Sequence, residues 1–421
     1  MKNDSYIVRP LICILLVALL GGTLISINTG RVNSDTAMLL GGMCLTLAVV
    51  YALLRFFPLG DHYIFMITAM LGVIGVIMLL RLQTGHGQKQ VVWFSIGTAL
   101  FLVTSLIYRH IKFWHKLNRL YVIGGIMLFA ATALFGYSSG GAKSWLRLGG
   151  FSFQPSELVK ILFILTLAGV FTNEYKKPME NDNKIKTFYN TKLGRNCAAT
   201  VVAYMFLLFL LLQRDWGTAV LFFAIYIAFI AIYGEDRRFL LLNAAAAVMV
   251  SFVGIKFMRH IQIRIETWLR PFDDVANKGY QITQSLFAIG EGGFTGRGIG
   301  AGSPYYIPEV HSDFIFSAIC EEMGILGGLA VIMLYFVLVY RAFKISLSTN
   351  NAFNKAVAMG IGVMIGVQTF IIIGGVIKFI PLTGITLPFV SYGGSSMVAT
   401  FFALGILQGI SARRREIEDE I

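Results

Sequence analysis

An aspartate, Asp313, stands where the longest polar segment of the chain meets a long apolar run. It belongs to the stretch 305–316, YYIPEVHSDFIF, which also carries Glu309 and His311. A carboxylate at the edge of an apolar run is costly to hold unless it is paired, caps a helix or is used in function. The spacing allows a structural role, in which Ser312 caps a helix and Asp313 sits in its first turn. It equally allows a functional acid.

A second polar stretch, 141–160, contains GAKSWLRLG followed by FQPSELVK. Proline suits the first position of a helix, so we expect a helix that begins at Pro155 and presents its positive end as a ready anion site. Glu157 and Lys160 are three residues apart and therefore share one helical face. They form either a simple ion pair or part of a polar cavity. The candidate residues of this stretch are Lys143, Trp145, Arg147, Glu157 and Lys160.

Two more polar motifs lie beside apolar runs. QRDWGT, at 213–218, contains Asp215, and IPLTGITLPFVSYGGSS occupies 380–396. Two prolines and three glycines in the latter predict broken backbone, which a membrane protein tolerates where it lines a protein-enclosed cavity. The candidate residues there are Ser391, Gly393, Gly394 and Ser395.

The long polar segment 258–312 carries Arg264, Trp268, an amphipathic stretch at 280–289 and a glycine-rich part at 290–302. It contains no GxxxxGK[ST] sequence, so a phosphate-binding P-loop is excluded. We expect its glycines to form flexible, close-packed backbone beside a groove.

The elements that must hold these residues are membrane-spanning helices. Hydrophobic residues make up 56% of the 421 residues and charged residues 14%, and the mean hydropathy is +0.72. Runs of about 18 apolar residues mark candidate transmembrane helices. We expect twelve, near residues 11–27, 37–54, 63–80, 91–108, 120–137, 155–172, 197–212, 216–233, 239–257, 314–340, 355–377 and 388–410. The predicted fold class is an all-α polytopic membrane protein with a long extracytoplasmic loop.

Composition also narrows the function classes. The net charge is +13, but in a membrane protein excess Lys and Arg marks cytoplasmic loops, and no nucleic acid is implied. The four cysteines lie in apolar runs without a CxxC pair, and the six histidines show no metal-ligand spacing. The first apolar run passes the length of a signal peptide without an A-x-A-like site, which predicts a retained first span.

Basic residues orient the helices. Alternate connections are rich in Lys and Arg, and the positive-inside rule puts these connections and both termini in the cytoplasm. The basic groups lie at 109–119, 172–195, 237–238, 341–355 and 413–415. The four polar motifs then all open on the outer side, and we expect them to converge on one face.

The motifs GAKSWLRLG, FQPSE, Q-x-D-x-GTA, PEVHSDFIF and GITLPFVSYGGSS, in this order, are similar to those of the RodA/FtsW/SpoVE (SEDS) family of cell-wall polymerases. The resemblance covers roughly residues 60–412. Family members usually have ten spans, which implies two additional N-terminal transmembrane helices at 1–60, a SEDS core at 61–412 with an extracytoplasmic loop at 258–313, and a charged cytoplasmic tail at 413–421. Arg214 and Trp216 depart from the family, which more often has Pro and Leu there, and this leaves the local shape around Asp215 open.

The resemblance implies a peptidoglycan glycosyltransferase that polymerises lipid II, the undecaprenyl-diphosphate-linked disaccharide-pentapeptide, at the outer face of the bacterial cytoplasmic membrane. Asp313 matches the family's essential aspartate and would remove the proton from the acceptor sugar's 4-hydroxyl as a general base. The leaving undecaprenyl diphosphate would be stabilised by basic side chains, a helix N-terminus or a divalent cation, Mg or Mn, whose ligands are unknown. The expected substrate-binding residues are Lys143, Trp145, Arg147, Glu157, Lys160, Asp215, Arg264, Glu309, His311, Glu321, Ser391, Gly393, Gly394 and Ser395.

Glu321 lies eight residues after Asp313, with Ser317 between them, so we expect it to face the same cavity. Trp145 and Trp268 either stack on sugars or anchor the protein at the membrane interface.

The resemblance implies a class B penicillin-binding protein, a transpeptidase, as partner, together with other elongation or division proteins. It does not separate cell shape, division and sporulation. Two other classes fit the sequence: a transporter or flippase of a lipid-linked precursor, which also uses broken helices and buried charges, and a catalytically silent scaffold. Against the transporter, the polar residues cluster on the outer side and the chain shows no paired halves with matching interruptions.

Overall fold

The computed structural model describes residues 5–30, 33–57, 59–111, 113–139, 141–172, 191–234 and 236–419. Within these ranges, twelve helices are long and apolar enough to cross a membrane, which confirms the predicted polytopic helical fold. Most of the connection expected at 172–195 lies outside the described residues. The chain divides into two compact units: Met1–Arg109 with Gln262–Arg341 and Gln368–Ile421, and His110–Ile261 with Ala342–Val367.

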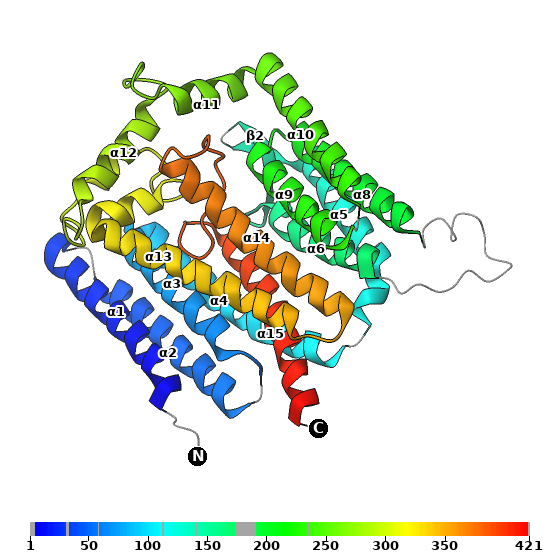
Figure 1. Cartoon of the computed structure of the whole chain (residues 1–421). Helices are drawn as coiled ribbons and strands as arrows, with labels where there is room; N and C mark the ends of the chain where they lie inside the picture. Colours follow the sequence, from blue (N-terminus) through cyan, green and yellow to red (C-terminus); the bar gives the residue numbers. More distant parts are fainter. Residues whose placement is uncertain are drawn as a thin grey trace, which may run out of the picture. The chain divides into compact units, whose positions relative to one another are not determined.

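The first unit is built around α3 (His62–Leu82), which is buried along most of its length. Helices α1 (Ser5–Thr29) and α2 (Ser34–Phe56) lie side by side next to it (Figure 1). The unit also contains α12 (Tyr280–Gly292), the short 3-10 helix η2 (Pro304–Tyr306) and α15 (Gly394–Asp419). Helix α4 (Thr84–His110) belongs to this unit up to Arg109, and helix α11 (Arg259–Leu269) belongs to it from Gln262 onward.

Glycines let the helices of this unit approach closely. A Cβ at Gly72 would strike the ring of Phe94, and one at Gly75 would lie 2.8 Å from the backbone of Val390. Any larger residue at Gly75 would therefore push α3 away from the backbone at Phe389 and Val390.

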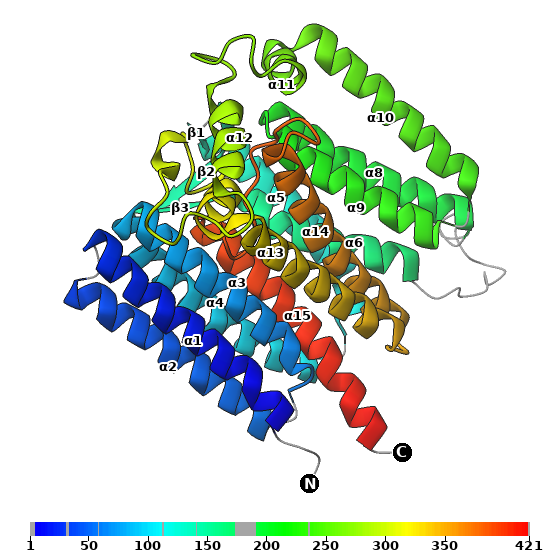
Figure 2. The same ribbon diagram turned by 60° about the vertical axis from the view of Figure 1, so that its left-hand side comes forward.

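The second unit packs α8 (Lys192–Leu212), α9 (Trp216–Tyr233) and α10 (Arg237–Phe257) as neighbouring helices (Figure 2). Its other elements are η1 (Trp114–Leu117), α5 (Asn118–Phe135) and α6 (Pro155–Thr172). Phe129, Phe163, Phe206 and Phe222 form a buried aromatic core, with Phe163 and Phe222 stacked at a centroid distance of 5.0 Å. The helix at Pro155 begins where the sequence predicted.

A small antiparallel sheet in this unit was not predicted. Strands β1 (Tyr137–Ser139), β2 (Ala142–Leu148) and β3 (Phe151–Phe153) occur in the order β1-β2-β3. Gly149 and Gly150 have φ of +53° and +90° and form the turn between β2 and β3. Two successive positive φ angles suit the right-handed twist of a two-residue hairpin, which explains the glycine pair.

Helix α13 (Ile315–Leu347) is interrupted at Gly324, where φ is +69° and ψ is −175°. The interruption frees backbone groups, and residues 293–298 of the glycine-rich segment 290–302 supply their partners. The amides of Arg297 and Gly298 donate to the carbonyls of Glu321 and Glu322 at 3.0 and 2.9 Å. The amides of 325 and 326 donate to the carbonyls of 293 and 294. The predicted close-packed backbone is thus a loop bonded into a broken helix.

The predicted broken backbone at 380–396 is confirmed. Helix α14 (Ala352–Val376) ends before this region and α15 begins only at Gly394, six residues later than the expected start of the last span at 388. Positive φ angles at Lys378, Gly384 and Phe389 turn the chain between the two helices.

Candidate functional site

Asp313 lies just before α13, in a turn that reverses the chain. Its amide and that of Ser312 both donate to the carbonyl of Glu309 at 3.1 Å, and Glu309 has a φ of +54°. The Ser312 hydroxyl also donates to that carbonyl, at 3.2 Å. Of the two roles that the spacing allows, the structural one does not hold here: Ser312 does not cap the helix, and Asp313 precedes its first turn. A non-glycine residue at positive φ stores backbone strain, which is typical of functional turns.

The Asp313 carboxyl group is held in a poorly solvated, mixed-charge environment. Burial raises the pKa of Asp313 to about 6, and the neighbouring negative charge of Glu309 acts in the same direction. The Arg264 guanidinium and a hydrogen bond from Ser312 oppose this rise. A carboxylate with a pKa near 6 is mostly ionised at neutral pH and is well matched to accepting a proton.

Arg264 approaches Asp313 because α11 is bonded to the broken segment after α14. Its Nη1 donates to the carbonyls of Leu382 and Thr383 at 3.0 and 2.8 Å. The indole of Trp268, one turn further along α11, donates to the carbonyl of Lys378 at 3.1 Å. Trp268 is thus an anchor for α11 within the protein.

Gly384 lies next to both the Asp313 carboxylate and the Arg264 guanidinium. A Cβ added there would lie 3.5 Å from Oδ2 of Asp313 and 3.6 Å from Nη2 of Arg264. Its φ is +73°, which favours glycine in any case. The broken segment therefore forms a wall of the space next to the Asp313 carboxylate.

Ser391 joins the broken segment 380–396 to the turn that contains Asp313 through hydrogen bonds of its hydroxyl group. Its hydroxyl donates to the carbonyl of Ser312 at 2.5 Å and accepts from the amide of Leu387 at 2.9 Å. Gln90 on α4 donates to the carbonyl of Ser391 at 3.0 Å and is fully buried. The sequence did not single out Gln90, because this residue ends a short polar stretch before an apolar run and belongs to no motif.

The remaining residues of the SYGGSS motif serve packing and helix initiation. The amide of Gly393 lies 3.5 Å from Oε1 of Gln90. A Cβ at Gly394 would sit 2.5 Å from the ring of Trp93, so glycine permits this contact. Ser395 is half-exposed in the first turn of α15.

Two imidazoles and a phenol form a cluster beside the same turn. His86 stacks on Tyr392 with a centroid distance of 4.2 Å and lies 4.5 Å from the ring of His311. The amide of Tyr392 donates to the carbonyl of His311 at 2.9 Å, and Nε2 of His311 lies 3.6 Å from a carboxylate oxygen of Glu309. His86 is a further residue that sequence reasoning missed.

A buried ion pair supports the glycine-rich segment. Arg81 donates from Nε to Oε1 of Glu322 at 2.9 Å and from Nη2 to the carbonyl of Gly302 at 2.9 Å. Oε2 of Glu322 accepts from the amide of Gly300 at 3.1 Å. Arg81 lies one residue beyond the span expected at 63–80, and the structure places it, buried, in the last turn of α3.

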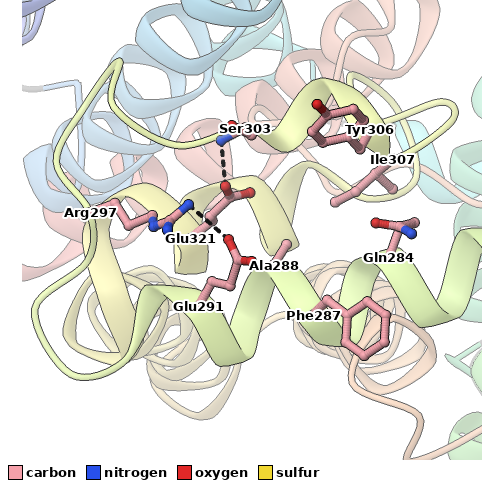
Figure 3. A pocket seen from close by; sticks show the side chains of 9 residues that line it. All are labelled: Gln284, Phe287, Ala288, Glu291, Arg297, Ser303, Tyr306, Ile307 and Glu321. Atoms are coloured by element: carbon pink, nitrogen blue, oxygen red, sulfur yellow. Dashed lines mark hydrogen bonds and ion pairs between the residues drawn. The ribbon is translucent and has the colours of Figure 1, made fainter.

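Glu321 does not join Asp313. Its Oε1 accepts from the amide of Ser303 at 2.5 Å, and its side chain lines a cavity whose described lining residues do not include Asp313 (Figure 3). The expected common face is wrong because Asp313 lies outside the helix, where helical spacing does not apply.

In the second unit, Glu157, Lys160 and Asp215 form a separate polar cluster. Lys160 is buried and lies 2.6 Å from Glu157, so the predicted ion pair exists. Asp215 caps α9 by accepting from the amide of Thr218 at 3.2 Å, and its other oxygen accepts from Gln154 at 3.3 Å. Burial raises the pKa of Asp215, the hydrogen bonds from Thr218 and Gln154 lower it, and the charge of Glu157 adds to the rise.

The three residues expected from GAKSWLRLG lie on β2. Lys143 donates from Nζ to the carbonyl of Ala133 at 2.7 Å, near the end of α5. Its charge thus complements a helix C-terminus. Arg147 lies over the ring of Tyr137 at 5.4 Å, and Trp145 is paired in register with Tyr137. In these contacts Lys143 and Arg147 stabilise the sheet and its neighbouring helix.

The candidate residues thus fall into two groups. Asp313, Arg264, Glu309, His311 and the 391–395 residues gather in the first unit, and the 143–160 residues with Asp215 gather in the second. In the described part of the chain, no three His, Cys, Asp or Glu side chains are grouped to hold a metal. A Mg or Mn ion would therefore have at most two of these side chains as ligands in the described part of the chain.

Fold and site together define a polytopic helical membrane protein whose ionisable groups are buried beside broken helices. A family model described as "Cell cycle protein", and named for FtsW, RodA and SpoVE, matches residues 61–416. The chain belongs to this family, as the sequence motifs predicted. Helices α1 and α2 lie before the matched region.

Individual relatives agree with this assignment. The chain is 33% identical over 400 residues to the peptidoglycan glycosyltransferase RodA of Mycobacterium tuberculosis, covering 86% of this chain and 81% of that protein. It is 33% identical over 333 residues to stage V sporulation protein E of Bacillus subtilis, covering 78% and 87%. The fold resembles a chain of a peptidoglycan synthase complex with a TM-score of 0.67 at 23% identity, covering 84% of this chain and 98% of that one.

Proposed function

We propose that this protein is a peptidoglycan glycosyltransferase that polymerises lipid II at the outer face of the bacterial cytoplasmic membrane. The observation that carries the proposal is Asp313, held beside Arg264 and Gly384 with its pKa raised to about 6. Relatives of similar length that carry the name peptidoglycan glycosyltransferase support the reaction class. They do not favour the transporter alternative.

In this mechanism, the Asp313 carboxylate accepts the proton of the acceptor sugar's 4-hydroxyl. The freed oxygen attacks the anomeric carbon of the donor, and the bond from that carbon to the diphosphate oxygen breaks. Undecaprenyl diphosphate leaves with the bonding electron pair. Arg264 is the cation of the first unit placed to offset negative charge near Asp313, since it already lowers the pKa of that carboxyl.

The test is polymerisation of labelled lipid II by the purified full-length protein. Asp313→Asn keeps the size of the side chain and removes the base, so we expect a loss of about 100- to 10,000-fold in rate. Asp273→Asn, an exposed aspartate of the same unit, is the matched control and should polymerise normally. Near-normal polymerisation by a folded Asp313→Asn protein would rule out the general base.

A class B penicillin-binding protein, which crosslinks glycan strands, is the partner that fits this function. The support is the fold likeness to a chain of a complex in which polymerisation and crosslinking are coordinated. Copurification of the two full-length membrane proteins tests the pairing, and it should survive Asp313→Asn because that change alters no apolar contact surface.

Both termini face the cytoplasm in this proposal, and segment 258–313 faces outward, as the distribution of Lys and Arg favours. In a variant lacking the four native cysteines, Thr295→Cys and Asn350→Cys place single thiols at exposed positions on opposite sides. An impermeant thiol reagent should label position 295 alone in intact cells and both positions after permeabilisation. Labelling of position 350 but not of position 295 in intact cells would show that the topology is the reverse of the one proposed.

A further inference from the structure

A cavity of about 150 Å³ lies among α12, the glycine-rich segment and the beginning of α13, all within the first unit. It is open to the surface and has two chemically different ends (Figure 3). Its lining residues are Gln284, Phe287, Ala288, Glu291, Arg297, Ser303, Tyr306, Ile307 and Glu321.

At the polar end, one oxygen of the Glu321 carboxylate receives no hydrogen bond from the described residues. Glu321 is 2% exposed, and while Oε1 accepts from the Ser303 amide, Oε2 has no hydrogen-bond partner among the described residues. Nearby, Arg297 pairs with Glu291 at 2.9 Å. Since a buried acceptor without a donor is costly, this end favours a ligand that brings an O–H or N–H group.

The other end presents aromatic surface. Phe287 is 50% and Tyr306 57% exposed, and Ile307 and Gln284 lie between them (Figure 3). Aromatic rings pack against the apolar C–H face of a sugar, while carboxylates and amides accept from or donate to its hydroxyls and acetamido group. Few ligands combine an apolar face with a rim of donors as sugars do.

The charges of the cavity exclude two other ligand classes. Two carboxylates and one guanidinium leave a negative excess, which disfavours a phosphate or other anion. A metal ion would find only two carboxylates here, one of them already paired with Arg297. An isolated ammonium group would match the polar end but leave the aromatic end uncovered.

We infer that this cavity is a glycan subsite, separate from Asp313, that binds one N-acetylhexosamine unit. Glu321 and Gln284 recognise its hydroxyl and acetamido groups, and Phe287 with Tyr306 covers its apolar face. The inference rests on the proposed function, because a polymerase must hold a growing glycan strand as well as the reacting sugars. Glu321 takes no part in the proton transfer; it binds substrate.

The test is equilibrium binding of tri-N-acetylchitotriose to the full-length purified protein, by calorimetry. Glu321→Gln should weaken binding about tenfold or more, because it removes the charged acceptor while the amide oxygen still accepts from Ser303. Phe287→Ala should weaken it about three- to tenfold. The matched control is Phe294→Ala. Phe294 is an exposed residue of the glycine-rich segment and does not line the cavity, so this variant should bind the trisaccharide like the wild type.

Each outcome decides the inference. Absence of trisaccharide binding, or binding unaffected by Glu321→Gln and Phe287→Ala in proteins with wild-type unfolding profiles, overturns the subsite. Binding that Asp313→Asn abolishes also overturns it, because the sugar would then sit at the base. Tight binding of a lysine-containing peptide without the sugar assigns the cavity to an amine instead. A wild type that binds the sugar but makes no polymer from lipid II refutes the proposed function and leaves the subsite standing.

Discussion

Arg81 on α3 and Glu322 on α13 form a buried ion pair, with Nε and Oε1 2.9 Å apart. Both side chains also bond the glycine-rich segment, through the carbonyl of Gly302 and the amide of Gly300. Removing one partner leaves a buried charge without compensation, which typically costs about 3–5 kcal/mol. The pair therefore couples two helices and the segment between them.

We expect Arg81→Met and Glu322→Leu each to lower the free energy of unfolding by about 3 kcal/mol or more. The double variant Arg81→Met/Glu322→Leu should recover much of that loss, since neither charge remains buried. Denaturant unfolding in mixed micelles measures the cycle. Lys278→Met breaks the exposed pair with Glu266 and, as the control, should cost less than about 1 kcal/mol. Single variants no worse than this control would contradict the coupling.

The rate of polymerisation should depend on pH through Asp313. The base accepts a proton only when ionised, so the rate should fall about tenfold per unit below pH 6 and level off above pH 7. Initial rates between pH 5 and 8 give the profile. A rate independent of pH across this range would mean that another group accepts the proton.

The same raised pKa predicts a cost in stability. The folded protein binds the Asp313 proton more tightly than the unfolded chain does, so this group loses stabilising free energy as pH rises from about 4 through 6. Asp313→Asn cannot ionise and should therefore unfold at a higher temperature than the wild type at pH 7.5, with a smaller difference at pH 5. Thermal unfolding at both pH values checks this, and Asp273→Asn should show no such gain.

Gly384→Ala should impair activity more than stability. The methyl group would lie in van der Waals contact with Oδ2 of Asp313 and occupy space that the acceptor hydroxyl needs, so we expect the rate to fall about tenfold or more. The positive φ adds a backbone cost of about 1–2 kcal/mol. Gly149→Ala carries a comparable backbone cost in open space. Measuring the polymerisation rate and the free energy of unfolding of both variants separates the loss of space next to Asp313 from the backbone cost. Equal polymerisation rates for Gly384→Ala and Gly149→Ala would mean that Gly384 is needed only for its backbone conformation.

Removal of residues 1–60 should preserve lipid II polymerisation. The helices α1 and α2 lie before the family match at residue 61, and none of the groups around Asp313 comes from them. They do contact the rest of the unit, since α1 packs on α3 and Asn28 donates to the carbonyl of Ile299 at 2.6 Å. Such an exposed bond contributes little. A folded but inactive truncated protein would assign these helices to the catalytic part, and Asn28→Ala would then show whether this contact is the reason.

The sequence predicted the helices well because apolar runs long enough to cross a bilayer have few alternatives. It also predicted the break at 380–396 and the ion pair between Glu157 and Lys160, since prolines, glycines and helical spacing act locally. It failed at Glu321, because Asp313 lies in the turn before α13, where the four-residue spacing of a helix does not apply.

Partners contributed by distant segments were not predictable. Gln90 and His86 come from α4 and Arg81 from α3, yet they contact residues more than two hundred positions later in the chain. A single polar residue within or beside an apolar run has no periodicity to reveal its partner. The β2 strand was missed because a seven-residue polar stretch between helices resembles a loop until its glycine turn is seen to pair it.

The hydrogen bond from the Trp268 indole to the carbonyl of Lys378 gives the molecule an intrinsic optical signal. Indole emission shifts with the polarity and hydrogen bonding of its surroundings, and the chain contains only five tryptophans. Trp268 and Arg264 both hold α11 to the segment that carries Gly384, so a movement of α11 away from that segment would break the indole hydrogen bond and change the Trp268 emission. The contact between α11 and the broken segment can therefore be followed by intrinsic tryptophan fluorescence, without an attached dye.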